Sequence, residues 1–242
     1  MKHLRIGWGV LVGWAVPALV VVAFAERWVE LPDRWNPWAP LWPHEPPTAL
    51  TSYKLARLSG DPQACARALV ATSLSFASVP DRPLSNGCGW SDAVRVTALP
   101  TRVAPPIVLS CPAAVSLAMW ERHALQPAAE AMLGDRVAAM EHFGGYACRD
   151  IGGGTRGQEG GEHRSEHATA NALDVAAFVL ADGRTVSVAR DWQRPADDPR
   201  RRFLQAVHDG ACGVWNVVLG PDYNAAHRDH FHLDLGRSRA CR

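Results

Sequence analysis

Two short segments rich in histidine and carboxylate constrain the fold more than any other feature of the chain. They read SEHATANALD (residues 165–174) and HRDHFHLD (residues 227–234). Zinc holds nitrogen and oxygen ligands at about 2.0–2.2 Å, so two ligand atoms of one site lie about 3–4 Å apart. If His167 and Asp174 shared an ion, a straight strand would separate their backbones by about 23 Å and a helix by about 10 Å. The chain must therefore double back between them, which the small residues of ATAN permit.

The second segment can supply a third ligand, and His232 is the best candidate. In a terminal strand His230 and His232 point to the same face. One of them can therefore bind an ion while the other lies beside the bound water or a substrate. Two nitrogens and one oxygen suit Zn²⁺ better than calcium or magnesium. Asp234 and Glu166 are interpreted as structural residues.

The spacing of both segments resembles that of the zinc peptidases that cut bacterial peptidoglycan, the superfamily of the D-alanyl-D-alanine carboxypeptidases and the penicillin-insensitive murein endopeptidase. Their S-x-H-x-x-G-x-A-x-D motif is met except at Ala170, which takes the place of the glycine, and their H-x-x-H-x-H motif is met by the second segment. The resemblance implies a zinc ion on His167, Asp174 and His232, with the fourth position left to water.

The same resemblance implies roles for the residues around the ion. Asp229 stands three places before the last zinc histidine, where relatives carry the general base, and His230 would stabilise the oxyanion or orient the water. Arg149, in GGYACR, resembles the arginine that contacts the substrate. Ser165 and His227 would support the ligands by hydrogen bonds. Two alternatives stay open: Asp229 could merely orient a histidine, and His227 and His230 could exchange roles.

A closer resemblance covers nearly the whole region after the N-terminus. The segments CPAAVSLAMWERHALQPAAE, YACRDI, SEHATANALDVAAF and DGACGVWNVVLGPDYNAAHRDHFHLD are similar to the bacterial extensin-like C-terminal domain family. The chain has none of the Ser-Pro repeats of a structural extensin. The resemblance implies that residues 52–242 form an extensin-like domain with a zinc-peptidase-like fold.

The N-terminus indicates export. Residues 1–5 are basic, and residues 6–25 form an uncharged apolar run, IGWGVLVGWAVPALVVVAFA. About 20 such residues can just span a bilayer. The run's length, Trp8 and Trp14, and the preceding basic residues favour a single-pass anchor, with residues 1–5 in the cytoplasm and the body on the periplasmic side of the inner membrane. The alternative is a signal peptide, cleaved near Ala25, that releases the chain into the periplasm.

The six cysteines agree with export. Their number is even, and none forms a C-x-x-C pair, so we expect disulfides rather than thiolate metal ligands. The sequence does not choose among the possible pairings. Pairing in chain order is the simplest expectation: Cys65 with Cys88, Cys111 with Cys148, and Cys212 with Cys241.

The remaining pattern predicts an α+β domain after a linker. Residues 26–51 are rich in proline and tryptophan, and Trp35, Trp38 and Trp42 either lie at the membrane interface or pack on the domain. We expect helices near residues 64–73, 112–133 and 201–209, hairpins at Asn86-Gly87 and Asp182-Gly183, and a last strand at residues 231–235. The expected fold is a small antiparallel sheet with flanking helices around a zinc-peptidase (LAS/hedgehog-like) core, preceded by an N-terminal apolar helix.

These features together favour an exported zinc-dependent hydrolase of peptidoglycan peptide bonds, of the carboxypeptidase or endopeptidase type. The formal net charge of +1 gives no pull toward nucleic acid. The alternative is a non-catalytic wall-binding or scaffold domain whose zinc site is structural. A soluble peptidase for dipeptides is a third interpretation, although the glycine-rich residues 152–161 suit a bulkier substrate better.

Overall fold

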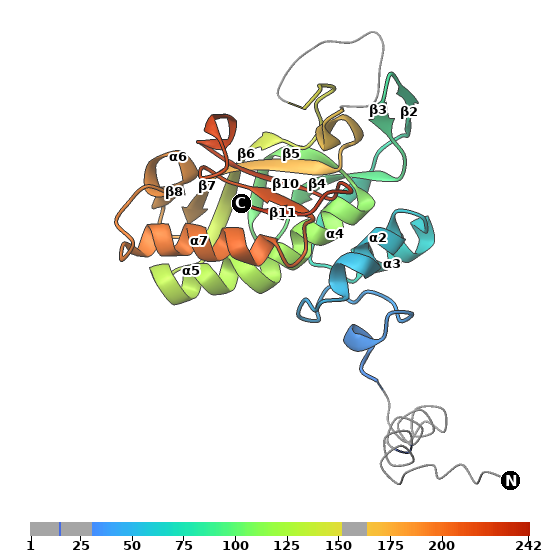
Figure 1. Ribbon diagram of the computed structural model, residues 1–242, viewed down its shortest axis with the longest axis horizontal. Helices are drawn as coiled ribbons and strands as arrows, with labels where there is room; N and C mark the ends of the chain where they lie inside the picture. Colours follow the sequence, from blue (N-terminus) through green and yellow to red (C-terminus); the bar gives the residue numbers. More distant parts are fainter. Residues whose placement is uncertain (1–14, 16–30, 152–163) are drawn as a thin grey trace, which may run out of the picture.

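The structure is a computed structural model that describes Ala15, residues 31–151 and residues 164–242. Its strands are β1 (Ser75–Ser78), β2 (Arg82–Ser85), β3 (Cys88–Trp90), β4 (Ala93–Ala98), β5 (Arg102–Ser110), β6 (Val137–Gly144), β7 (Ala172–Leu180), β8 (Thr185–Ser187), β9 (Val217–Leu219), β10 (Phe231–Asp234) and β11 (Ala240–Cys241). Within the described ranges, nine of them form one sheet in the order β1-β4-β5-β6-β7-β10-β9-β11, with β8 paired to β7 (Figure 1). β2 and β3 form a separate ribbon.

The expected mixture of helices and strands is confirmed, but the expectation of a small antiparallel sheet was wrong. The sheet is large, and two pairs, β5–β6 and β9–β11, are parallel. One of the strands that the sequence did not predict is β5, which contains Pro105 and Pro106. Proline cannot donate to a strand ladder. At the start of β5, Arg102 pairs with both β4 and β6, and Val103 pairs with β6. Pairing with β4 resumes at Ile107, so both prolines lie between the two paired stretches.

The helices expected near residues 64–73, 112–133 and 201–209 are present, whereas the helices at Thr51–Leu58 and Val188–Asp191 were not expected. The helices comprise α2 (Thr51–Leu58), α3 (Pro62–Val70), α4 (Cys111–Trp120), α5 (Gln126–Leu133), α6 (Val188–Asp191) and α7 (Pro199–Ala211), with the short turns η1 (Asp33–Trp35), η3 (Glu166–Thr169) and η4 (Ala225–His227). Ser110 caps α4 by accepting the N–H of Ala113. A π-helical turn, η2 (Glu121–Leu125), joins α4 to α5 just before Pro127, which has no N–H to donate.

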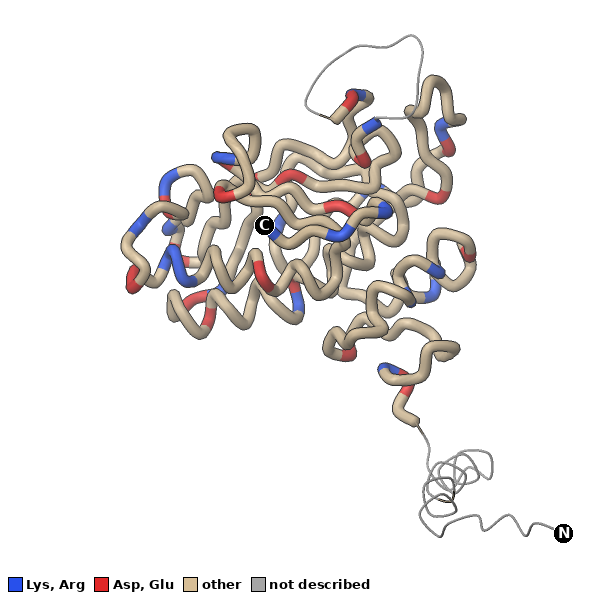
Figure 2. The backbone as a smooth tube through the Cα atoms, in the orientation of Figure 1, with Lys and Arg blue, Asp and Glu red and all other residues tan. Residues whose placement is uncertain are grey.

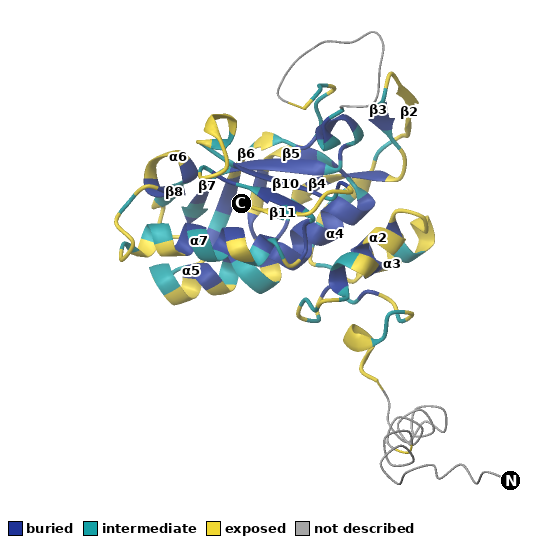
Figure 3. Ribbon diagram, viewed as in Figure 1, coloured by how far each residue is buried: buried dark blue, intermediate teal, exposed yellow. Residues whose placement is uncertain are grey.

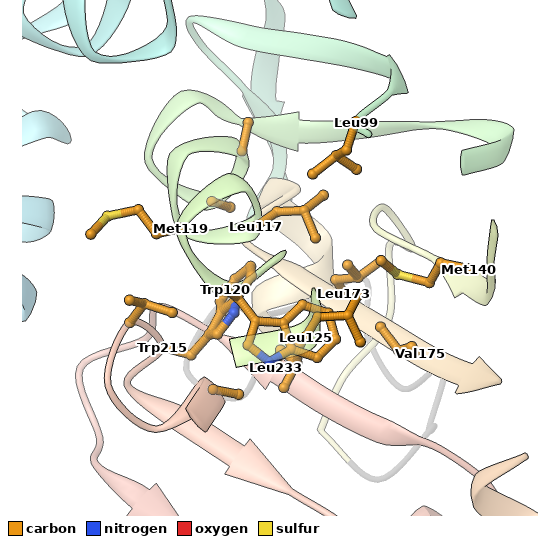
Figure 4. Packing of buried hydrophobic residues seen from close by; sticks show 14 of the residues in the cluster. Leu99, Leu117, Met119, Trp120, Leu125, Met140, Leu173, Val175, Trp215 and Leu233 are labelled. Atoms are coloured by element: carbon orange, nitrogen blue, oxygen red, sulfur yellow. The ribbon is translucent and has the colours of Figure 1, made fainter. Parts of the chain in front are cut away.

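The core lies between the sheet and the helices α4, α5 and α7, which run together along one face (Figure 1). Every residue of α4 is buried (Figure 3). Trp120 packs against Phe178 of β7, which in turn meets Phe203 of α7, with ring centroids 6.0 and 5.4 Å apart. The Trp120 indole donates to the carbonyl of Val207 at 2.9 Å. Figure 4 shows Leu117 and Trp120 of α4 near Leu173 and Leu233 of the sheet. Each large apolar side chain that is buried in this way contributes about 1.5–3 kcal/mol.

Three disulfides form, but only one follows chain order. Cys212 pairs with Cys241, as expected. Cys65 pairs with Cys111, and Cys88 pairs with Cys148, so the expected Cys65–Cys88 and Cys111–Cys148 bonds were wrong. The reason is tertiary packing: α3 lies against the start of α4, whereas β3 lies beside η3 and the segment that follows β6.

Residues 31–50 run along the domain. Leu41 and Pro43 are buried, and the Pro43 carbonyl lies 2.9 Å from His123 Nε2, whereas Trp38 is exposed. The apolar helix expected at residues 6–25 lies outside the described residues. No helix within the described part of the chain is long and apolar enough to cross a membrane. Basic and acidic residues are interspersed over the domain in the view of Figure 2.

Candidate metal centre

A tight turn before β7 brings His167 back toward Asp174. Ser165 begins η3 by accepting the His167 N–H, and the turn ends at Ala170, whose φ of 56° is left-handed. A side chain costs about 1–2 kcal/mol in this conformation, and glycine avoids that cost. The motif glycine that Ala170 replaces therefore stands where the backbone favours glycine. The expected reversal of the chain is confirmed.

The pairing of β7 with β10 brings in the third residue. Asp174 and His232 are directly opposed in the antiparallel register. Opposed residues on one face lie within side-chain contact. His232 Nδ1 lies 2.8 Å from Asp174 Oδ1, so residues 58 apart in sequence meet because of strand register.

Three donor atoms converge on one point. His167 Nε2 lies 3.1 Å from Asp174 Oδ1 and 3.2 Å from His232 Nδ1, which completes a triangle of nearly equal sides. Donor atoms about 3 Å apart could each lie about 2.0–2.2 Å from one zinc ion. All three residues are buried, and His232 also lines a neighbouring cleft. The donor set therefore fits zinc in both chemistry and size.

Each histidine is oriented by a hydrogen bond from its other ring nitrogen. His167 Nδ1 lies 3.1 Å from the Gly145 carbonyl, and His232 Nε2 lies 2.9 Å from Asp234 Oδ2. Asp234 Oδ1 in turn accepts the Gly236 N–H at 2.7 Å. These bonds place the remaining lone pair of each ring toward the triangle, as in carboxylate–histidine–zinc arrangements.

Without an ion, the triangle holds a proton. Burial alone would lower the pKa of His232, but hydrogen bonds to Asp174 and Asp234 outweigh it and raise that pKa to about 9. Burial likewise opposes ionisation of Asp174, and the hydrogen bonds from His167 and His232 overcome it and lower its pKa. A bound metal ion would take the place of this proton.

A cleft of about 530 Å³ opens beside the triangle, and its walls include Arg149, Tyr223, His227 and His230. His230 Nδ1 is bonded to Asp229 Oδ1 at 2.9 Å, and its Nε2 lies 3.6 Å from Asp174 Oδ1. This hydrogen bond from His230 lowers the pKa of Asp229, which stays ionised. The two residues form a carboxylate–imidazole pair that points toward the triangle.

His227 lies beside both His230 and His232, with ring centroids 5.3 and 5.7 Å away. Burial, followed by the neighbouring His232 and His230, lowers its pKa to about 4, so the ring is neutral near pH 7. Its Nδ1 lies 2.8 Å from Asn224 Oδ1 and donates to it. Because Nδ1 carries the proton, Nε2 keeps a free lone pair.

A family model described as Extensin-like protein C-terminus matches residues 63–242. The chain belongs to this family. No curated protein and no solved structure matches it. The match confirms the expected extensin-like membership and does not extend to the zinc-peptidase superfamily.

The extensin-like domain brings together all the residues that the sequence singled out. Arg149 Nη2 lies 3.4 Å from Asp174 Oδ2, so it contacts the triangle as well as the cleft. Ser165 acts on the backbone of η3 rather than on a ligand side chain. Asp229 contacts His230, which corresponds to the orienting alternative.

Sequence reasoning missed Asp234, which was interpreted as merely structural. The sequence did contain a signal for this contact, because His232 and Asp234 are two residues apart in a strand and therefore lie on the same face. A further His–Cys–Cys cluster, His208 with Cys212 and Cys241, lies elsewhere in the extensin-like domain. Its cysteines form a disulfide and cannot act as thiolate ligands.

Proposed function

We propose that this extensin-like domain is an exported zinc-dependent hydrolase that cuts peptide bonds of peptidoglycan. The observation that carries the proposal is the convergence of His167, Asp174 and His232 beside an open cleft that His232 lines, with the Asp229–His230 pair next to them. The wall as the site of action is supported by the expected export and by the resemblance of both motifs to peptidoglycan peptidases.

His167, Asp174 and His232 would hold the ion, which when bound polarises the scissile carbonyl and lowers the pKa of its bound water toward neutrality. Asp229 keeps the proton of His230 on Nδ1, so that Nε2 is free to accept a proton from the attacking water. His230 can then return that proton to the leaving amine.

Arg149 lies beside the same carboxylate and lines the cleft. A guanidinium suits the carboxylate of a peptide or the developing oxyanion. The exposed side chains of Tyr223 and Ile151 also line the cleft, which suits a bulky substrate.

A non-catalytic wall-binding domain is the second candidate function. It is favoured by the 3.6 Å approach of His230 Nε2 to Asp174 Oδ1, because a fourth protein ligand would close the site as in structural zinc centres. The two functions differ in what His230 does. As a proton carrier it is dispensable for metal binding, and as a ligand it is required.

The test measures metal content and the release of soluble fragments from purified peptidoglycan for the full chain and its variants. His167→Ala should lose both, whereas His230→Gln and Asp229→Asn should keep zinc and stop cutting. Asp209→Asn is a matched control, because Asp209 contacts its neighbour His208 in the same way outside the cleft. Tight zinc with no cutting by the unmodified chain, and zinc loss in His230→Gln, would favour the structural site.

A further inference from the structure

The segment that precedes the globular domain exposes several large apolar side chains. The exposed fractions are 79% for Trp38, 46% for Trp35, 40% for Leu31 and 48% for Tyr53 of the neighbouring α2. Tryptophan is highly buried on average in soluble domains. We call these four residues the N-terminal aromatic face.

This face is held in place rather than hanging from a loose tail. Lys54 Nζ of α2 donates to the carbonyls of Asp33 and Pro40, at 2.6 and 3.2 Å. Arg57 Nη1, also of α2, donates to the Pro37 carbonyl at 2.7 Å. These bonds hold residues 33–40 against α2. The exposed indole rings of Trp35 and Trp38 therefore belong to a segment that is fixed to the domain.

The chemistry of the face combines aromatic rings with arginine. The Arg57 guanidinium lies 6.0 Å from the centre of the Tyr53 ring, and Arg34 is exposed between Asp33 and Trp35. The Asp33 carboxylate accepts a hydrogen bond from the Trp42 indole, with Nε1 and Oδ2 2.8 Å apart. Tryptophan and tyrosine concentrate at the headgroup level of bilayers, where arginine meets lipid phosphates.

The chain itself limits the distance between this face and a membrane. Five residues, 26–30, separate the apolar run at residues 6–25 from Leu31. An extended chain covers at most about 3.3–3.6 Å per residue, so the six steps from Ala25 to Leu31 span no more than about 22 Å. An anchor at residues 6–25 therefore keeps the face within reach of the bilayer surface.

We propose that the N-terminal aromatic face docks on the phospholipid surface of the membrane. The inference rests on the anchor expected at residues 6–25 and is independent of the metal site. In Figure 1 this blue segment lies at the opposite end of the domain from the turn that carries η3. Docking would thus turn the metal cleft away from the bilayer.

The test uses the full chain, labelled with 5-fluorotryptophan, in nanodiscs of phosphatidylethanolamine and phosphatidylglycerol. A fraction of the lipid carries a gadolinium chelate on its headgroup, which broadens nearby fluorine resonances. Single Trp→Phe variants assign the resonances of Trp35, Trp38 and Trp90. Trp90 is the control, because in Figure 1 β3 lies above α2 and α3, whereas the N-terminal segment lies below them.

We expect the Trp35 and Trp38 resonances to broaden several-fold relative to Trp90. A Trp38 resonance as sharp as that of Trp90 would overturn the proposal. Broadening of Trp38 only by gadolinium-tagged peptidoglycan fragments would overturn it as well, and would make the face a wall-binding surface. As a second measurement, Trp35→Ser/Trp38→Ser should speed hydrogen exchange in α2 in nanodiscs. Phe143→Ser/Ile151→Ser, at exposed positions outside α2 and α3, should leave it unchanged.

Discussion

Replacing Asp234 by asparagine removes one charge and almost no volume. One oxygen of Asp234 accepts the Gly236 N–H at 2.7 Å, and the other accepts His232 Nε2–H at 2.9 Å. In Asp234→Asn the amide oxygen can keep only one of these bonds. If it keeps Gly236, an NH₂ group faces Nε2–H, and the His232 ring must move its proton to Nδ1.

A proton on Nδ1 occupies the lone pair that faces Asp174 and the ion. Loss of such a supporting contact costs about 10–100-fold in metal affinity. This range corresponds to about 1.4–2.8 kcal/mol at 25 °C. We therefore expect Asp234→Asn to raise the zinc Kd by that factor while the fold persists.

The assay is competition between the protein and a chromogenic chelator at fixed pH, with circular dichroism to verify folding. Asp209→Asn is the control, because it makes the same change beside His208, away from the triangle. A zinc Kd for Asp234→Asn within about threefold of the wild-type value would refute the assignment of His232 Nδ1 as a ligand atom.

Three further outcomes follow from the structure. A Cβ on Gly145 would lie 2.6 Å from the Val108 carbonyl, so Gly145→Ala should lower the free energy of unfolding by about 1–3 kcal/mol, seen as a lower Tm, and weaken zinc binding through His167. In the metal-free protein the raised pKa of His232 stabilises the fold. This contribution is fully present below pH 6.5, the pKa of the unfolded state, and is lost as the pH rises through about 9. Denaturant titrations should show that loss of stability, and saturating zinc should abolish this pH dependence. Removal of the Cys88–Cys148 disulfide, which spans 60 residues, should cost about 4 kcal/mol in the chain-entropy model, and non-reducing peptide maps should link Cys88 to Cys148 and not to Cys65.

The candidate site shows how far local pattern carries. The spacing in SEHATANALD required a reversal of the chain, and η3 with the left-handed Ala170 supplies it. The sequence offered His232 as the best third ligand of the second segment, but its placement depends on the β7–β10 register. A shift of one residue in that register would turn the His232 side chain to the other face of the sheet.

The role of Asp229 and the disulfide pairing could not be read from the sequence. Asp229 stands where relatives carry the base, but its carboxylate meets His230 Nδ1 because of the local turn before β10. The cysteine pairs follow the packing of α3 on α4 and of β3 beside η3, contacts between elements that are distant along the chain.

The sequence by itself determined the residues able to bind a metal, the positions of most helices and turns, and membership of the extensin-like family. Periodicity, caps and turn residues act over a few positions, so they are visible in the chain. Only the tertiary structure decided the order of the nine strands that the described residues place in one sheet, the disulfide partners and the meeting of His167, Asp174 and His232. These depend on which distant surfaces bury one another, and that is set by the packing of the whole core rather than by any one segment.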